Sequence, residues 1–225
     1  MVERTGLAQT GWSAVDDYIG RHLIGDDPVL AATLAANAAG GLPDIDVSPA
    51  QGRMLGLMAR MMGAKRILEI GTLGGYSTIC LARALSAGGS LVTLEIDPHH
   101  AAIARANIAA AGFAACVEVI AGAAVETLAT LDGAFDFIFI DADKPSNTTY
   151  LAAALRLSRP GTAIVVDNVV REGGVLDPDS GDERIVGTRA LFAAIAAEPR
   201  LTATAVQTVG TKKWDGFVLA LVDIA

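Results

Sequence analysis

Short, almost continuous apolar runs recur through the middle of the chain, with segments of helical character between them. Four of these runs cover residues 66–70, 91–95, 136–140 and 162–166. Strands that are buried on both faces of a parallel sheet have this composition, because helices cover both faces. The pattern therefore predicts a doubly wound α/β fold, in which ligands bind beyond the carboxyl ends of the strands.

The complete pattern predicts a seven-stranded sheet preceded by N-terminal helices. The expected strands are 66–70, 91–95, 116–120, 136–140, 162–166, 202–207 and 216–222. No helical segment separates the last two, so we expect an antiparallel C-terminal hairpin. The expected helices are 12–23, 28–39, 49–62, 75–86, 98–111, 123–130, 147–157 and 184–198.

Composition limits the kinds of partner. The chain has 225 residues, 52% of them hydrophobic, and no Pro/Ser-rich linker, so we expect one domain, 1–225, with residues 1–45 as a helical extension. The net charge of −8 predicts no binding to nucleic acid or an anionic membrane, and favours a small neutral or cationic ligand. No apolar targeting or membrane-spanning stretch is visible, so we expect a cytoplasmic protein.

Several residues have an ordinary structural interpretation. Cys80 and Cys116 share no metal-binding spacing and are expected to be buried thiols. The histidines His22, His99 and His100 receive no role. Met54, Leu57, Met58 and Met61 form an apolar stripe at helical spacing. This stripe could line a hydrophobic ligand pocket, but core packing is the favoured interpretation.

A glycine-rich turn follows the first strand and predicts a cofactor site. Glycines in Glu69-x-Gly71-x-x-Gly74-Gly75 allow a tight turn and close approach of a ligand, although such turns also occur where no ligand binds. Leu73 replaces the second glycine of a dinucleotide-binding turn, which argues against NAD. Glu95 ends the next strand, where an acid can bind both hydroxyls of a ribose. A buried Glu69 needs a cation or several donors, such as an ammonium or sulfonium ligand.

Oxygen-bearing side chains follow two other strands and predict a metal site. Asp141, Asp167 and Asn168 offer hard oxygen ligands, which suit Mg²⁺, Mn²⁺ or Ca²⁺ rather than zinc. The alternative is that Asp141 only caps a helix and that Asp167 and Asn168 only form a turn.

Three motifs resemble a known family. They are residues 68–77 (LEIGTLGGYS), 137–144 (FIFIDADK) and 166–169 (VDNV). From about Asp46 to its C-terminus the chain resembles class I S-adenosylmethionine-dependent O-methyltransferases of the catechol and caffeoyl-CoA type, in their bacterial branch. The resemblance implies a Rossmann-like sheet, the cofactor S-adenosylmethionine, a divalent metal, and a small aromatic substrate with vicinal hydroxyls. We also expect a homodimer.

The resemblance also implies roles for individual residues. Asp141, Asp167 and Asn168 match the metal ligands, and Lys144 matches the general base, with Asp141 as the second catalytic residue. The expected cofactor-binding residues are Val47, Glu69, Gly71, Thr72, Gly75, Tyr76, Ser77, Glu95, Ile96, Gly122, Ala123, Ala124, Asp141 and Asp143.

Some features depart from the family or stay open. The run Lys144-Pro145-Ser146-Asn147 lacks the acidic residue and the tyrosine that usually follow the lysine, and a solvated Lys144 is the alternative to a base. Residues 171–187 are polar and glycine-rich, which favours a lid or substrate loop. Trp214 either stacks on an aromatic substrate or packs at the hairpin edge.

Two other functions use the same kind of fold. An NAD(P)-dependent oxidoreductase would need an intact dinucleotide turn, which Leu73 interrupts. A non-catalytic S-adenosylmethionine-binding protein would be expected to lack Lys144 or a metal ligand, and this chain keeps all four residues.

Overall fold

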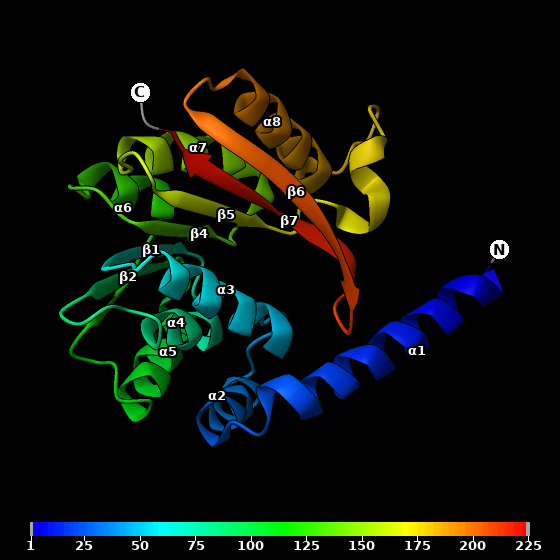
Figure 1. Cartoon of the computed structure of the whole chain (residues 1–225), viewed down its shortest axis with the longest axis horizontal. Coiled ribbons are helices and arrows are strands. Elements are labelled where there is room, and N and C mark those ends of the chain that lie inside the picture. Colours follow the sequence, from blue (N-terminus) through cyan, green and yellow to red (C-terminus); the bar gives the residue numbers. More distant parts are fainter. Residues whose placement is uncertain (1, 224–225) are drawn as a thin grey trace.

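A computed structural model describes residues 2–223 and shows a seven-stranded sheet with helices on both faces (Figure 1). The strand order is β3-β2-β1-β4-β5-β7-β6. The first five strands run parallel, and β7 is antiparallel to both β5 and β6. The strands are β1 Arg66–Ile70, β2 Ser90–Glu95, β3 Val117–Ala121, β4 Phe137–Ile140, β5 Ala163–Asp167, β6 Leu201–Gly210 and β7 Lys213–Val222. The expected doubly wound fold with its antiparallel hairpin is confirmed.

Helices α3, α4 and α5 lie on one side of the sheet and α6, α7 and α8 on the other (Figure 1). The α-helices are α1 Val2–Ile19, α2 Pro28–Ala39, α3 Pro49–Met61, α4 Tyr76–Ala82, α5 Pro98–Ala110, α6 Ala124–Thr130, α7 Asn147–Arg156 and α8 Glu183–Ala197. Short turns of other helix types are η1 Gly20–Ile24, η2 Lys144–Ser146 and η3 Arg171–Leu176. Ser48 caps α3 by accepting a hydrogen bond from the Gln51 amide at 3.2 Å.

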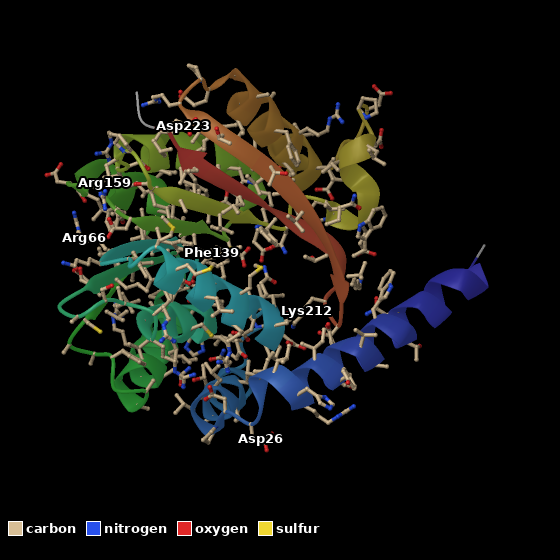
Figure 2. The ribbon with its side chains drawn as sticks, viewed as in Figure 1. Asp26, Arg66, Phe139, Arg159, Lys212 and Asp223 are labelled. Atoms are coloured by element: carbon tan, nitrogen blue, oxygen red, sulfur yellow. The ribbon has the colours of Figure 1, made fainter. Side chains whose placement is uncertain are left out.

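Alternate residues of each central strand enter two separate cores. Ile67 of β1 and Phe139 of β4 pack with α3, α4 and α5, and Figure 2 labels Phe139 at this position. Leu68 of β1 and Ile138 of β4 pack with α6, α7 and α8. Because the side-chain period of a strand is two residues, an apolar run without alternation fills both cores. Among the described residues, no helix is long and apolar enough to cross a membrane.

The N-terminal helix is longer than the sequence pattern indicated. It begins at Val2 rather than near residue 12, continues into the π-helical turn η1, and extends beyond the body of the protein (Figure 1). Its inner half is joined to the β6–β7 turn, because the Gln9 side chain donates to the Gly210 carbonyl at 2.8 Å and Asp16 accepts from the Thr211 amide at 2.7 Å. At the same turn, Lys212 (Figure 2) donates to Asp44 at 2.9 Å.

The favoured interpretation of the methionine stripe is only half correct. Met54 and Met58 pack against the core, whereas Leu57 is 51% exposed and Met61 is 78% exposed. The face that α3 buries is instead made by Gly52, Leu55 and Ala59. Gly52 packs so closely that a Cβ there would lie 2.9 Å from the Cys80 sulfur, and spacing alone does not reveal this choice of face.

Candidate active site

A cavity of about 680 Å³ lies at the carboxyl ends of β2, β1, β4 and β5. Most of the predicted site residues line it: Val47, Gly71, Thr72, Ser77, Glu95, Ile96, Ala124, Asp141, Asp143, Lys144 and Asn168. The other predicted residues do not line it: Glu69, Gly75, Tyr76, Gly122, Ala123 and Asp167. The fold therefore gathers the two strand-end motifs and the glycine-rich turn around one space, as ligand sites in open α/β sheets require.

The turn after β1 has backbone that few side chains allow. Gly71 has φ +98°, and a Cβ there would lie 2.1 Å from the Asp141 carbonyl oxygen, so only glycine fits between β1 and the end of β4. Leu73 has φ +51°, a left-handed conformation that costs energy for a branched residue. Such conformations are found where a ligand site holds the backbone in place. The turn is therefore built to expose its backbone to the cavity.

Glu95 holds this turn from the neighbouring strand. One carboxylate oxygen accepts from the amides of Thr72 at 3.2 Å and Leu73 at 2.7 Å, and the other accepts from the Asp97 amide at 3.0 Å. A carboxylate has about four acceptor positions, so these bonds leave capacity for a ribose hydroxyl. The sequence predicted the ribose contact but not the structural role, in which Glu95 stabilises the strained turn.

Glu69 is fully buried at the end of β1 and lacks part of its hydrogen bonding. Oε2 accepts from Thr78 and, at 2.7 Å, from Thr93, whereas the buried Oε1 has no partner among the described residues. Burial raises the pKa of Glu69 to about 7, although the nearby hydroxyl groups of Ser77, Thr78 and Thr93 oppose this. An orphaned buried oxygen is costly. A ligand ammonium group would satisfy it, which fits the amino-acid part of S-adenosylmethionine.

Lys144, Asp141 and Asp167 meet where β4 and β5 end. The strands pair Ile140 with Val166, so Asp141 and Asp167 occupy adjacent positions beyond that pair. The Lys144 Nζ donates to Asp141 Oδ1 at 2.8 Å, and Lys144 is only 6% exposed. Lys144 is therefore a buried lysine held by a carboxylate, and not the solvated alternative.

Asp167 is a buried carboxylate close to other charges. It is 4% exposed, and burial together with the Asp141 carboxylate raises its pKa well above the usual range, whereas Lys144 opposes the shift. Asn168 follows with φ +56°, and its amide donates to Asp167 Oδ1 at 2.8 Å, as expected of the turn alternative. Asp141, in contrast, accepts from a side chain rather than capping a helix.

The residues around this point fit a hard divalent cation. Two carboxylates and one amide, from Asp141, Asp167 and Asn168, are the oxygen ligands that Mg²⁺ prefers. The repulsion between Asp141 and Asp167 is what a bound cation would relieve. Within residues 2–223, no group of three or more His, Cys, Asp or Glu residues forms a metal site, so the amide is needed to complete the set.

Some cavity residues were missed by the sequence analysis. Tyr150 donates its hydroxyl to Asp143, and hydrogen bonds from Ser146 and Tyr150 lower the pKa of Asp143 against the effect of burial. His100 lines the cavity, with Nδ1 3.8 Å from Glu95 Oε1. Arg171 and Arg184 line it from the β5 side. No motif includes these side chains, because they approach from α5, α7, η3 and the first turn of α8. The sequence predicted Arg171 and Arg184 only as members of the 171–187 lid or substrate loop.

The segment 171–187 is not a loop throughout. It begins with the turn η3, Arg171–Leu176, and ends with the first residues of α8, which begins at Glu183. Only residues 177–182 lie between these two elements. Trp214 packs against this segment, since a Cβ on Gly173 would lie 3.0 Å from its ring, and its indole donates to Gln207 at 3.0 Å. This is the hairpin-edge alternative, and Trp214 is not part of the cavity lining.

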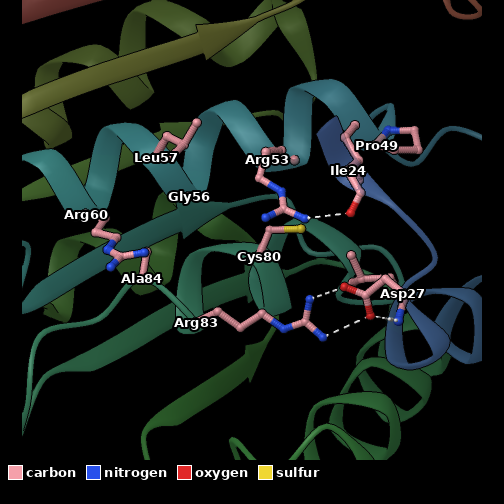
Figure 3. A pocket seen from close by; sticks show the side chains of 12 residues that line it. Ile24, Asp27, Pro49, Arg53, Gly56, Leu57, Arg60, Cys80, Arg83 and Ala84 are labelled. Atoms are coloured by element: carbon pink, nitrogen blue, oxygen red, sulfur yellow. Dashed lines mark hydrogen bonds and ion pairs between the residues drawn. The ribbon is translucent and has the colours of Figure 1, made fainter. Parts of the chain in front are cut away.

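Two smaller cavities lie elsewhere. One, of about 130 Å³, lies among η1, α2, α3 and α4 (Figure 3), and no predicted site residue lines it. There Arg83 pairs with Asp27, Arg53 donates to the Ile24 carbonyl at 3.2 Å, and burial raises the pKa of Cys80 to about 12. The other, of about 200 Å³, is lined by Asp167 and Asn168 and by the β6–β7 turn. It adjoins the main cavity at Asn168.

The strand order and the acidic, glycine-rich edge of the sheet define a methyltransferase-type α/β fold. The sequence matches the O-methyltransferase family over residues 24–221. It is 53% identical over 209 residues to a catechol O-methyltransferase from Mycobacterium tuberculosis, covering 92% of this chain and 94% of that protein. The chain therefore belongs to the O-methyltransferase family.

Solved structures agree with this assignment. An O-methyltransferase from Bacillus cereus in complex with SAH is 54% identical, with a TM-score of 0.94 over 95% of this chain and 99% of that chain. The O-methyltransferase TomG from Streptomyces achromogenes, involved in tomaymycin synthesis and solved with SAM, is 47% identical, with a TM-score of 0.93 over 96% of this chain and 99% of that chain.

Proposed function

We propose that this protein transfers a methyl group from S-adenosylmethionine to one hydroxyl of a small aromatic substrate with vicinal hydroxyls, with the help of a divalent metal. The observation that carries the proposal is the buried Lys144, whose Nζ lies 2.8 Å from Asp141 at the sheet edge that also bears Asp167 and Asn168. The catechol O-methyltransferase from Mycobacterium tuberculosis supports the substrate class, and the SAH and SAM complexes support the cofactor.

The cofactor end of the cavity is the part lined by the β1 turn and the end of β2. S-adenosylmethionine would supply an activated methyl group there. Glu69 and Ser77 would bind its amino-acid part, Glu95 its ribose, and Ile96 with residues 122–124 its adenine. Gly71, Thr72, Gly75 and Tyr76 would shape the turn around it, with Val47 and Asp143 as further contacts. The unpartnered Oε1 of Glu69 supports this orientation, because a positive amino group is what it lacks.

The metal would be held by Asp141, Asp167 and Asn168. A divalent cation at that point would lower the pKa of a bound hydroxyl and hold two adjacent substrate oxygens. Magnesium fits the oxygen ligands, and manganese or calcium would fit the same set.

Lys144 would remove the proton from the substrate hydroxyl. Its Nζ is fixed by Asp141 and faces the cavity from the start of η2. An amine that is fixed within hydrogen-bond reach of a hydroxyl can act as its general base. The phenolate oxygen that remains can then attack the methyl carbon in line, so that the O–CH3 bond forms as the S–CH3 bond breaks and S-adenosylhomocysteine leaves, because the cavity would hold both partners in one orientation.

Apolar residues would keep water from this reaction. Leu73, Leu94, Ala142 and Pro145 line the cavity between its polar groups. Opposite charges disappear when an anionic oxygen attacks a sulfonium, so a dry cavity favours the transition state. Lys144 and Asp141 would therefore act on the substrate proton within a largely apolar wall.

The experiment is methyl transfer followed by mass spectrometry. The purified protein is incubated with S-adenosylmethionine and 3,4-dihydroxybenzaldehyde, with Mg²⁺ in one sample and excess chelator in another. We expect a singly methylated product with Mg²⁺ and none with chelator. Full activity in excess chelator would contradict the metal assignment, and no product with any catechol would contradict the proposed function.

Assembly and location are also proposals. We propose a homodimer in the cytoplasm, which size-exclusion chromatography with light scattering and cell fractionation would test. A monomer at micromolar concentration would contradict the first proposal, and recovery in the membrane fraction would contradict the second.

A further inference from the structure

One cation on the cavity lining has no partner among the residues that the structure describes. Seven other charged side chains of that lining form a hydrogen bond or ion pair with another described residue: Asp46, Glu95, Asp97, Asp141, Asp143, Lys144 and Arg184. The Arg171 guanidinium differs, because it forms neither with any side chain or backbone group that the structure describes between residues 2 and 223. An arginine at a cavity without a partner is available to a ligand.

Strained backbone places this arginine at the cavity. Arg171 and Glu172 have φ of +56° and +53°, which side-chain-bearing residues rarely adopt. Asp215 of β7 holds them, because its Oδ1 accepts from the amides of Val170 at 2.9 Å, Arg171 at 3.1 Å and Gly216 at 3.0 Å. Strain that the surrounding structure maintains is typical of functional sites.

The cations near Arg171 are already paired. The Lys213 Nζ lies 3.4 Å from Glu172 Oε1, and Arg184 pairs with Asp182. The Asp182 carboxylate acts on Arg171 only at longer range. Among the described residues, Arg171 is therefore the cation of the cavity lining that is left without a paired carboxylate, although the whole chain carries −8.

The position of Arg171 suits the substrate rather than the cofactor. It follows Asn168 by three residues, beyond the end of β5, whereas Glu95 ends β2. Three strand spacings separate β2 from β5, which is about 14 Å. An aromatic ring with its hydroxyls at Lys144 and Asn168 would direct its other substituents toward this end.

We propose that Arg171 binds a carboxylate carried by the substrate ring, so that the preferred acceptor is an anionic catechol. The proposal rests on the proposed function. The planar guanidinium matches both oxygens of a carboxylate, and such pairs are stronger than hydrogen bonds between neutral groups. The net charge of the chain predicts a neutral or cationic ligand. At the β5 end of the cavity, however, the Arg171 guanidinium would favour a substrate that carries a carboxylate.

The test compares acids with their neutral esters. kcat and KM are measured for 3,4-dihydroxybenzoate and 3,4-dihydroxycinnamate and for their methyl esters, with the wild type and Arg171→Gln. We expect the variant to lose about 10- to 100-fold in kcat/KM for at least one acid, mainly through KM, and less than about threefold for the esters. Arg171→Glu should reverse the preference toward the cationic catechol dopamine.

Arg200→Gln is the matched control, since it removes the same charge at an exposed position where Arg200 pairs with Glu198. It should leave the ratio of acid to ester unchanged. Equal losses of kcat/KM for acids and esters in Arg171→Gln, or no loss, would overturn the proposal for Arg171. The proposed function would still stand in that case if the wild type methylates the esters. No methylation of any catechol by the wild type would instead overturn the proposed function. In that case, thermal shifts with S-adenosylhomocysteine and each acid still report whether Arg171 binds the carboxylate.

Discussion

The Nζ of Lys144 lies 2.8 Å from Oδ1 of Asp141, three residues earlier in the chain, and Lys144 is almost fully buried. A charged lysine is rarely buried unless it is paired. The pair places a potential base directly beside a proposed metal ligand. Proton removal and metal binding would thus share one carboxylate.

This relationship predicts a specific kinetic defect for Lys144→Ala. Without the lysine amine, kcat should fall by about 10² to 10⁴, because no group removes the substrate proton. The defect should shrink with catechols whose hydroxyls are more acidic, such as a nitrocatechol. The measurement is kcat for both enzymes across catechols of graded acidity. Equal losses for every substrate would mean that Lys144 positions the substrate and that the base lies elsewhere.

Asp167 should separate metal binding from cofactor binding. We expect Asp167→Ala to abolish methyl transfer and to leave the affinity for S-adenosylhomocysteine mostly unchanged, because the proposed metal would serve the methyl acceptor and not the cofactor. Asp141→Ala should also abolish transfer but could affect both ligands, since Asp141 lines the main cavity. Calorimetric titration with S-adenosylhomocysteine in chelator measures the difference. A large loss of affinity in Asp167→Ala would contradict the separation.

Glu95 should contribute to cofactor affinity more than to turnover. Glu95→Gln replaces a charged acceptor that holds the amides of Thr72 and Leu73, so cofactor binding should weaken by about 1 to 3 kcal/mol. At saturating cofactor, kcat should change much less. The measurement is the dissociation constant for S-adenosylhomocysteine. An unchanged constant would remove Glu95 from the cofactor site.

Gly71 should be less replaceable than another glycine with similar backbone. Gly71→Ala forces a Cβ to 2.1 Å from the Asp141 carbonyl oxygen, whereas at Gly112, with φ +87°, a Cβ meets nothing within 4 Å. Gly112→Ala should therefore cost about 1 kcal/mol in unfolding free energy, from backbone strain alone. Gly71→Ala should cost more and also weaken cofactor binding. Urea unfolding measures the first effect and calorimetry the second. Equal costs would mean that the contact with Asp141 relaxes easily.

The sequence predicted the central strands well because β1, β4 and β5 are almost fully buried. Phe137–Ile140 has no polar residue, so the hydrophobic run, the strand and both cores coincide. The N-terminal helix was predicted too short, because α1 lies partly outside the body and no amphipathic period indicates its start. Periodicity also misplaced the buried face of α3, where contact with Cys80 selects glycine.

The candidate site was predictable where side chains follow strand ends. Asp141, Lys144 and Asn168 reach the cavity from strand-end motifs, and topology alone brings such motifs together. Tyr150 was not predicted, and Arg171 was predicted only as part of a lid or substrate loop, since their positions depend on how α7 and η3 pack. The role of Glu95 in bracing the turn depends on hydrogen bonds that spacing does not encode.

The buried Glu69 predicts how stability without cofactor depends on pH. Its pKa is about 7 in the folded protein, against an ordinary value of 4.5 for a solvated glutamate, because burial disfavours the charged form. Between these values the folded state holds a proton that the unfolded state has lost. The contribution of Glu69 to the unfolding free energy is therefore fully present below pH 4.5. It is lost as the pH rises through 7, by about 3 kcal/mol in total. Glu69→Gln should flatten this dependence of the urea-unfolding free energy, and Glu118→Gln, at an exposed position, should not.

Cofactor binding should show the opposite dependence. The cofactor's ammonium group needs the ionised carboxylate, so affinity for S-adenosylhomocysteine should rise with pH up to about pH 7 in the wild type. The rise should be absent in Glu69→Gln, whose overall affinity should be lower because the amide is a weaker acceptor than a carboxylate. Calorimetry in buffers of different ionisation enthalpy measures the proton released from Glu69 on binding. Binding without proton release near pH 6 would mean that Glu69 is already ionised and that its Oε1 has found another partner.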